Sequence, residues 1–302
     1  MLGLLDLVRI GARAVSRYTG MVLALWVTQA LVTGAAIVGI AQTLAAALAD
    51  RPLLDDAVDG DLVALLELMS ALPELLWASI WTIVAIVLLW VVASWFLAGG
   101  VIAVLGERPE GRAATARCFG AGGANTFLAY VALGLYAWLG YMPAIIAFGM
   151  GADWAASRIE FALTLPEVAL SLGLGLAPGL LLWVVAGTVV DFARVELAAR
   201  RGSHELGALA AYARAWLFVL ARPLALVHAL LGWAFWIGIT LLYLWLAHGR
   251  AMLGTGGALT LLMIRQGVSL ARMVIKVGVV AGQVGLGDER MPPPRKPPRA
   301  TA

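Results

Sequence analysis

Long apolar stretches alternate with short charged ones along this chain, and the alternation predicts its elements. The apolar stretches cover roughly residues 20–47, 76–104, 126–149, 168–191, 223–247 and 257–283. Each supplies the roughly 20 mostly apolar residues that a helix needs to cross a bilayer. Pro143 and Pro178 fall inside two of them, where a membrane helix tolerates a kink, and Pro223 stands where a helix would start. The pattern predicts an all-α, polytopic membrane helix bundle of about six transmembrane helices over residues 20–286.

The first residues carry an amphipathic pattern instead. Arg9, Arg13 and Arg17 fall on one side of a predicted helix, and apolar residues such as Leu5 fall on the other. A cleavable signal peptide would have an uninterrupted apolar core, which these arginines break. We therefore expect residues 1–19 to form an interfacial helix that lies on the membrane surface.

Two further amphipathic stretches, residues 110–123 and 203–217, lie between predicted membrane helices, and we expect both to be short interfacial helices. The chain also repeats a short sequence: residues 88–93 and residues 181–186 both read Leu-Leu-Trp-Val-Val-Ala. Extending that match predicts a parallel repeat of residues 76–149 and 168–247. Identities among Leu, Val and Ala are also common by chance in so apolar a chain, so duplication and coincidence both stand.

Composition settles the class of protein. The chain of 302 residues is 62% hydrophobic and 13% charged, whereas soluble domains are about 45–50% apolar and about 25% charged. It is therefore an integral membrane protein. Its formal net charge of +3 is too small and too dispersed to indicate a nucleic-acid partner.

The distribution of charge predicts the orientation. Of the 21 basic residues, 18 fall in residues 1–19, 105–125, 192–222 and 265–302, which leaves only Arg51, Arg158 and Arg250 for the opposite side. Because loops rich in arginine and lysine stay on the cytoplasmic side, both termini should be cytoplasmic. The preference for arginine over lysine and the 34 glycines resemble bacterial usage, which predicts a bacterial inner (plasma) membrane.

Two polar segments lie outside the predicted helices. The aspartates between residues 50 and 61 could hold a cation, although a solvated external loop explains them better because the spacing of a calcium-binding loop is missing. Residues 287–302 are rich in proline and arginine, which predicts a disordered cytoplasmic tail. Such a basic tail would be attracted to anionic lipid.

Several polar residues lie within the predicted membrane helices, where an ionisable group costs about 2.5–3.5 kcal/mol unless it finds a partner or water. This intramembrane polar cluster consists of Gln29, Asp191, Arg194, Arg265, Ser269, Arg272 and Lys276. The last four lie on one stripe of the final helix, at spacings of four, three and four residues, so we expect the stripe to face protein.

We predict specific partners for these charges. Asp191 should pair with Arg272 or Lys276 and so hold the fourth and sixth membrane helices together, and Gln29 should accompany Arg265. The cluster is either structural or in contact with a substrate such as an anion or a lipid headgroup.

The motifs of known chemistry do not appear in the chain. It has no H-E-x-x-H zinc motif, no G-x-S-x-G serine elbow and no phosphate-binding P-loop. Cys118, the single cysteine, cannot form an internal disulfide. We therefore assign no catalytic residue, no metal site and no cofactor, and expect the protein not to be an enzyme.

A short run of motifs carries a resemblance. Asp191-Phe-Ala-Arg-Val195, a charged turn, Tyr212 and Arg222-Pro223 resemble a diffuse group of bacterial six-helix membrane proteins of unassigned activity. That group is similar to the membrane domain of some glycerophosphodiester phosphodiesterases. The resemblance implies a fold and a membrane location, but not that activity, because no phosphodiesterase domain is present.

Two functions fit these observations. The first is a scaffold or accessory protein in envelope or lipid handling, whose partners are membrane lipids and either another protein or further copies of the chain. The alternative is a transporter or channel for a small anionic substrate, with Arg265, Arg272 and Gln29 along its path.

Overall fold

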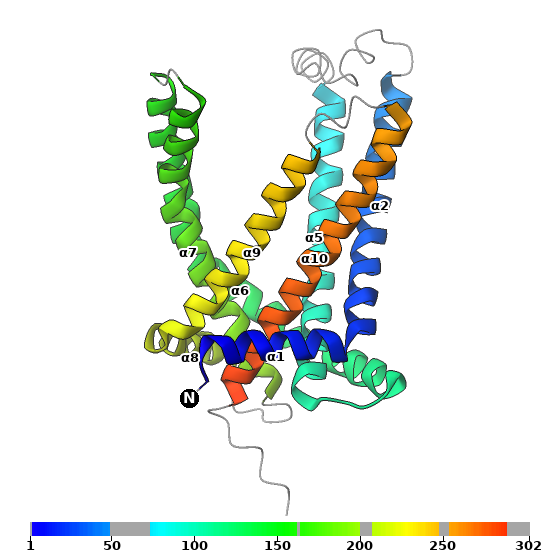
Figure 1. The fold of residues 1–302 in the computed structure, drawn as a ribbon, viewed down its shortest axis with the longest axis vertical. Coiled ribbons are helices and arrows are strands. Elements are labelled where there is room, and N and C mark those ends of the chain that lie inside the picture. The colour runs from blue at the N-terminus through cyan, green and yellow to red at the C-terminus, as the bar shows by residue number, and fades with distance from the viewer. Residues whose placement is uncertain (1, 49–72, 162–163, 200–206, 248–253, 289–302) are drawn as a thin grey trace, which may run out of the picture. The chain divides into compact units, whose positions relative to one another are not determined.

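The structure is a computed structural model that describes residues 2–48, 73–161, 164–199, 207–247 and 254–288. Within these ranges the chain forms helices and no strand. The helices are α1 (Leu4–Arg17), α2 (Thr19–Leu48), α5 (Pro73–Glu107), α6 (Arg112–Ile159), α7 (Leu165–Ala199), α8 (Ala208–Ala221), α9 (Pro223–Ala247) and α10 (Gly254–Asp288) (Figure 1). The predicted all-α class is confirmed.

The long helices are membrane spans by length and composition. In the described residues, five helices are long and apolar enough to cross a membrane, or six if α1 and the first half of α2 form one span. Large apolar side chains are exposed along them, for example Leu135 at 70% and Trp245 at 74%. Such exposure suits a surface that faces lipid, so the chain is a multi-pass membrane protein.

The chain divides into two compact units. One unit holds residues 1–23 and 95–302, and the other holds residues 24–94. The second unit consists of most of α2 and most of α5, both strongly apolar. Of the predicted polar cluster, only Gln29 lies in the second unit, and the other residues lie in the first.

Local sequence sets the ends of several helices. At the start of α1, the carboxylate of Asp6 accepts a hydrogen bond of 3.0 Å from the backbone N–H of Gly3. At the other end, α1 meets α2 at an angle of 80°. Gly111 precedes α6 with a φ of 82°, in the left-handed region that glycine adopts without a steric penalty. Pro223 opens α9, as predicted, because the first turn of a helix does not need its missing N–H.

Glycines bring helix backbones into direct contact at two crossings. A Cβ atom on Gly11 of α1 would lie 2.6 Å from the carbonyl oxygen of Gly278 on α10. A Cβ atom on Gly151 of α6 would overlap the carbonyl oxygen of Gly175 on α7. These backbone contacts fix α6 against α7 and α1 across α10.

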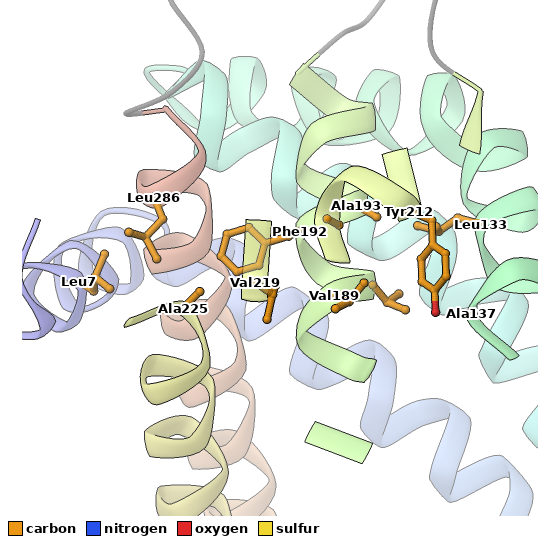
Figure 2. Packing of buried hydrophobic residues seen from close by; sticks show 12 residues of the cluster. Leu7, Leu133, Ala137, Val189, Phe192, Ala193, Tyr212, Val219, Ala225 and Leu286 are labelled. Carbon is orange, nitrogen blue, oxygen red and sulfur yellow. The ribbon is translucent and has the colours of Figure 1, made fainter. Parts of the chain in front are cut away.

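The core of the first unit lies at one end, which we call the base: the end where α1 and α8 lie and where α7 and α10 finish (Figure 1). Figure 2 shows a row of buried side chains crossing the base, from Leu7 of α1 and Leu286 of α10 through Phe192 of α7 to Leu133 of α6. Helix α8 joins the same apolar core through Val219, and α9 joins it through Ala225, so six of the described helices share it.

The two predicted repeat units differ in one respect. In the first, the amphipathic stretch 110–123 and the following span form one unbroken helix, α6. In the second, the corresponding stretch is a separate helix, α8, which Arg222 and Pro223 divide from α9. The duplication itself stays a prediction. The acidic segment at residues 50–61 and the tail from residue 289 lie outside the described residues.

Candidate functional site

Asp191 and Arg194, near the end of α7, form the centre of a polar site at the base. They lie one turn apart, and the Arg194 guanidinium donates to the Asp191 carboxylate at 3.3 Å. The other carboxylate oxygen of Asp191 accepts from the side-chain amide of Gln283 on α10 at 3.4 Å. Gln283 is only 2% exposed, so this contact is a part-buried link between α7 and α10.

A tyrosine ties a third helix to the same point. The hydroxyl of Tyr130 on α6 donates to the backbone carbonyl of Arg194 at 2.8 Å, and Tyr130 is 1% exposed. In a long helix this carbonyl would ordinarily accept from its own helix alone, and a carbonyl oxygen has a second lone pair to offer. The hydrogen bond therefore holds α6 against α7 at the level of the charged pair.

Two more polar side chains lie within electrostatic range of this pair. The ammonium of Lys276 on α10 interacts electrostatically with Asp191 and Arg194, and the hydroxyl of Tyr141 on α6 does the same. The Tyr141 ring packs on Trp183 of α7, with the ring centroids 4.6 Å apart. Lys276 is exposed, and neither Lys276 nor Tyr141 has a side-chain hydrogen bond or ion pair to the described residues.

Arg272, one turn before Lys276, is held separately. Its guanidinium donates to the hydroxyl of Thr240 on α9 at 2.5 Å and lies over the ring of Trp236 at 4.3 Å from the centroid. This cation–π stack and hydrogen bond join α9 to α10. These two contacts hold the guanidinium against α9, although its Nε atom has no hydrogen-bond partner among the described residues.

Several buried polar atoms at the base have no hydrogen-bond partner. Arg194 keeps a free Nε–H, and Gln283 keeps a free carbonyl oxygen, Oε1. The hydroxyl of Tyr212 and the Nδ1 atom of His228 are also unpartnered. Each such atom costs roughly 1–3 kcal/mol while it stays unsatisfied, so these positions call for water or a ligand.

Of the predicted cluster, the structure brings together Asp191, Arg194 and Lys276. The direct pair expected between Asp191 and Arg272 is wrong, because Arg272 bonds to Thr240 instead. Lys276 lies within electrostatic range of Asp191 without the expected direct ion pair. The two helices are nevertheless joined at Asp191, but through a neutral amide.

The remaining predicted residues lie elsewhere. Arg265 is exposed on α10, which contradicts the expectation that the whole stripe faces protein, and Ser269 is half-buried. The reason is that α10 packs against α1, α7 and α9 mainly toward its C-terminal end. Gln29 belongs to the second unit, so the predicted contact between Gln29 and Arg265 stays a prediction.

Sequence reasoning missed the residue that makes the link. Gln283 follows Lys276 by seven residues, which is two helical turns, so it continues the polar stripe of α10. Extending the stripe would have found it. Tyr130 and Tyr141 carried no comparable signal, because aromatic residues are common in membrane helices for packing alone.

No family model, no curated protein and no solved structure matches the chain. Its function must therefore be argued from the site. The site presents two cationic groups, a carboxylate, an amide and a hydroxyl at the end of a membrane bundle. Such a set can bind and orient a polar group.

Proposed function

We propose that the protein is a non-enzymatic scaffold or accessory protein of a bacterial inner membrane, which holds anionic lipid at its base. The proposal places the base and both termini on the cytoplasmic side, as the arginine bias predicts. We propose that this role belongs to lipid handling in the cell envelope, in line with the resemblance to six-helix membrane proteins.

One observation carries the proposal: α1 is locked against the base while its arginines remain exposed. Its apolar side meets α10 at Gly278 and enters the core through Leu7, which is fully buried. The side chains of Arg9 and Arg17 are 70% and 48% exposed although each lies near a carboxylate. A basic helix docked at the end of a membrane bundle suits anionic headgroups, at about 1 kcal/mol for each basic residue near the surface.

The intramembrane charges support a scaffold over a transporter. Arg272 is engaged with Thr240 and Trp236, and Asp191 with Arg194 and Gln283. These contacts join α9 to α10 and α7 to α10, which stabilises the bundle. Charges that line a path for ions would instead present free groups along it. Arg265 and Lys276, which are both exposed on α10, are the features that keep an anion transporter as the second candidate.

The test uses the full chain, extracted with a lipid-preserving polymer. We expect the extracted particles to be enriched in anionic phospholipid over the bulk membrane. Replacing Arg9, Arg13 and Arg17 together by Gln should remove most of that enrichment. The same three positions replaced by Lys keep the charge and serve as the matched control.

Two outcomes contradict the proposal. Lipid of bulk composition around both the parent and the Gln variant would refute an anionic-lipid scaffold. Flux of phosphate or chloride into liposomes that contain the protein, abolished by Arg265→Gln, would establish the transporter instead.

A further inference from the structure

We propose that α1 is an amphipathic wedge, whose exposed apolar edge of Leu5, Val8 and Ala12 inserts into the membrane leaflet at the base and makes the protein prefer a convex leaflet. The inference goes beyond the proposed function, which concerns the charge of the lipid and the arginines of α1. The wedge concerns the shape of the membrane and the apolar residues of the same helix. Both place α1 at the membrane surface.

The first argument is that α1 has three sides. One side meets the protein through Leu7 and Gly11, which are both buried. The arginines of α1 lie on another side, and all of them are exposed. The apolar edge lies between these two sides: Leu5 is 72% exposed, Val8 is 43% exposed, and Ala12 is exposed as well. Spacings of three and four residues keep this edge on one face of the helix.

The second argument is the orientation of α1. It meets the apolar first half of α2 at 80°, so where α2 crosses the membrane, α1 lies close to the membrane plane. Helix α10 continues from Gly278, where α1 crosses it, to Asp288, ten residues further on (Figure 1). That distance is about 15 Å at the rise of an α-helix. Helix α1 therefore lies beside α10 and not beneath it.

This sideways docking leaves two sides of α1 to face the lipid and the water. The side that carries Leu7 and Gly11 is directed at the protein, so the apolar edge and the arginines must divide the remaining surroundings between them. Apolar side chains lose free energy on leaving water, and guanidinium groups are stable among headgroups and water. The apolar edge therefore faces the acyl chains, and the arginines face the headgroups.

The third argument is that the depth of α1 is fixed. Its backbone touches that of α10, because a Cβ atom on Gly11 would lie 2.6 Å from the carbonyl oxygen of Gly278. At the end of α1, the hydroxyl of Tyr18 donates to the backbone carbonyl of Pro109 at 3.4 Å. A free amphipathic helix can leave the membrane surface, but α1 is held at both points. Its apolar edge stays inserted as long as the bundle is in the membrane.

A fixed wedge has a consequence for membrane shape. Side chains that insert at the boundary of headgroups and acyl chains expand one leaflet only. A convex leaflet has more widely spaced headgroups and accommodates them at a lower cost, which is why the binding of interfacial helices depends on curvature. The protein should therefore collect where the leaflet at its base is convex.

The first experiment measures the depth of α1 in the full chain, reconstituted in vesicles of phosphatidylcholine and phosphatidylglycerol. In a Cys118→Ser background, Leu5→Cys, Val8→Cys and Arg13→Cys each carry a small fluorescent dye. We expect nitroxide groups on the lipid acyl chains to quench the dye on Leu5→Cys and Val8→Cys, and iodide in the water to leave both unquenched. The dye on Arg13→Cys, the control on the basic side, should respond in the opposite way.

Two outcomes of this experiment overturn the insertion. Equal quenching of all three dyes by iodide would show that the apolar edge lies in water. Protection of Val8→Cys from both quenchers would show that a protein surface covers the edge.

The second experiment tests the preference for curvature in giant vesicles of the same lipids, from which narrow membrane tubes are pulled. Arg117, exposed near the start of α6, is replaced by Cys in the Cys118→Ser background. A dye that cannot cross the membrane labels it from outside, so only molecules with the base on the outer, convex leaflet are observed. We expect this protein to be enriched in the tube relative to the vesicle.

Replacing Leu5 and Val8 together by Gln should abolish the enrichment, and the fold should survive because both side chains are exposed. Leu5→Ile with Val8→Ile keeps the edge apolar and is the matched control, which should retain the enrichment. Equal density in tube and vesicle before any change to α1 overturns the curvature preference. Undiminished enrichment in the Gln variant does the same.

Failure of the wedge and failure of the proposed function are distinguishable. The variant with Gln at the three arginines of α1 should lose anionic lipid but stay enriched in the tube. The Gln variant of Leu5 and Val8 should lose the enrichment in the tube but still collect anionic lipid.

Discussion

Replacing Gly151 by Ala should separate α6 from α7, and the structure permits a quantitative expectation. The two helices form the most extensive helix pair among the described elements. A Cβ atom on Gly151 would overlap the backbone carbonyl oxygen of Gly175, and the reciprocal substitution would overlap that of Gly151. Because both partners are backbone, no side-chain rotation can relieve the clash.

The control lies two residues away in the same helix. A Cβ atom on Gly149 meets nothing within 4 Å. Alanine is favoured over glycine inside a helix by about 1 kcal/mol at either position. Inserting a methyl group into a packed contact costs about 1–3 kcal/mol. Gly149→Ala should therefore stabilise the protein by up to about 1 kcal/mol, and Gly151→Ala should be less stable than Gly149→Ala by about 1–3 kcal/mol.

The assay is reversible unfolding of the purified chain in mixed micelles, with increasing SDS and the helical circular dichroism as the signal. Comparing the two variants with each other cancels the helix-propensity contribution, which both share, and isolates the crossing. Equal stabilisation by Gly149→Ala and Gly151→Ala would refute the backbone contact between Gly151 and Gly175.

The remaining predictions use the same unfolding assay. Tyr130→Phe should cost about 0.5–1.5 kcal/mol because it removes the hydrogen bond to the Arg194 carbonyl. Tyr212→Phe should stabilise the protein, by up to roughly 1–3 kcal/mol, because it removes a buried hydroxyl that has no partner; equal losses in the two variants would contradict this assignment. Arg272→Lys should cost about 0.5–2 kcal/mol, since lysine cannot stack its planar group over Trp236. Trp fluorescence that stays unchanged in that variant would count against the stack.

The hydrophobic pattern was sufficient for the helices because each membrane span must bury its own backbone hydrogen bonds over a fixed thickness. The predicted stretches correspond to α2, α5, α6, α7, α9 and α10, and the amphipathic start corresponds to α1. The pattern did not predict helix boundaries where one helix runs from an amphipathic stretch into an apolar one. The stretch at residues 110–123 therefore merged into α6 instead of forming a helix of its own.

The candidate site was only partly readable. A charge inside an apolar run is visible in any sequence, so Asp191, Arg194 and Lys276 could be singled out. Their partners could not, because a membrane charge can be satisfied by a charge, an amide, a hydroxyl or an aromatic face at similar depth. Arg272 bonds to Thr240, and Asp191 bonds to Gln283, both neutral residues that pattern reasoning passes over.

The sequence by itself therefore determined the class of protein, the helices and the position of each charge along its helix, since these depend on local hydrophobicity and on the length of each span. Only the tertiary structure decided which charges meet. That choice depends on the rotation of each helix about its axis, which glycine contacts such as Gly11 with Gly278 set. Packing of this kind joins residues far apart in the chain, and no local period of the sequence encodes it.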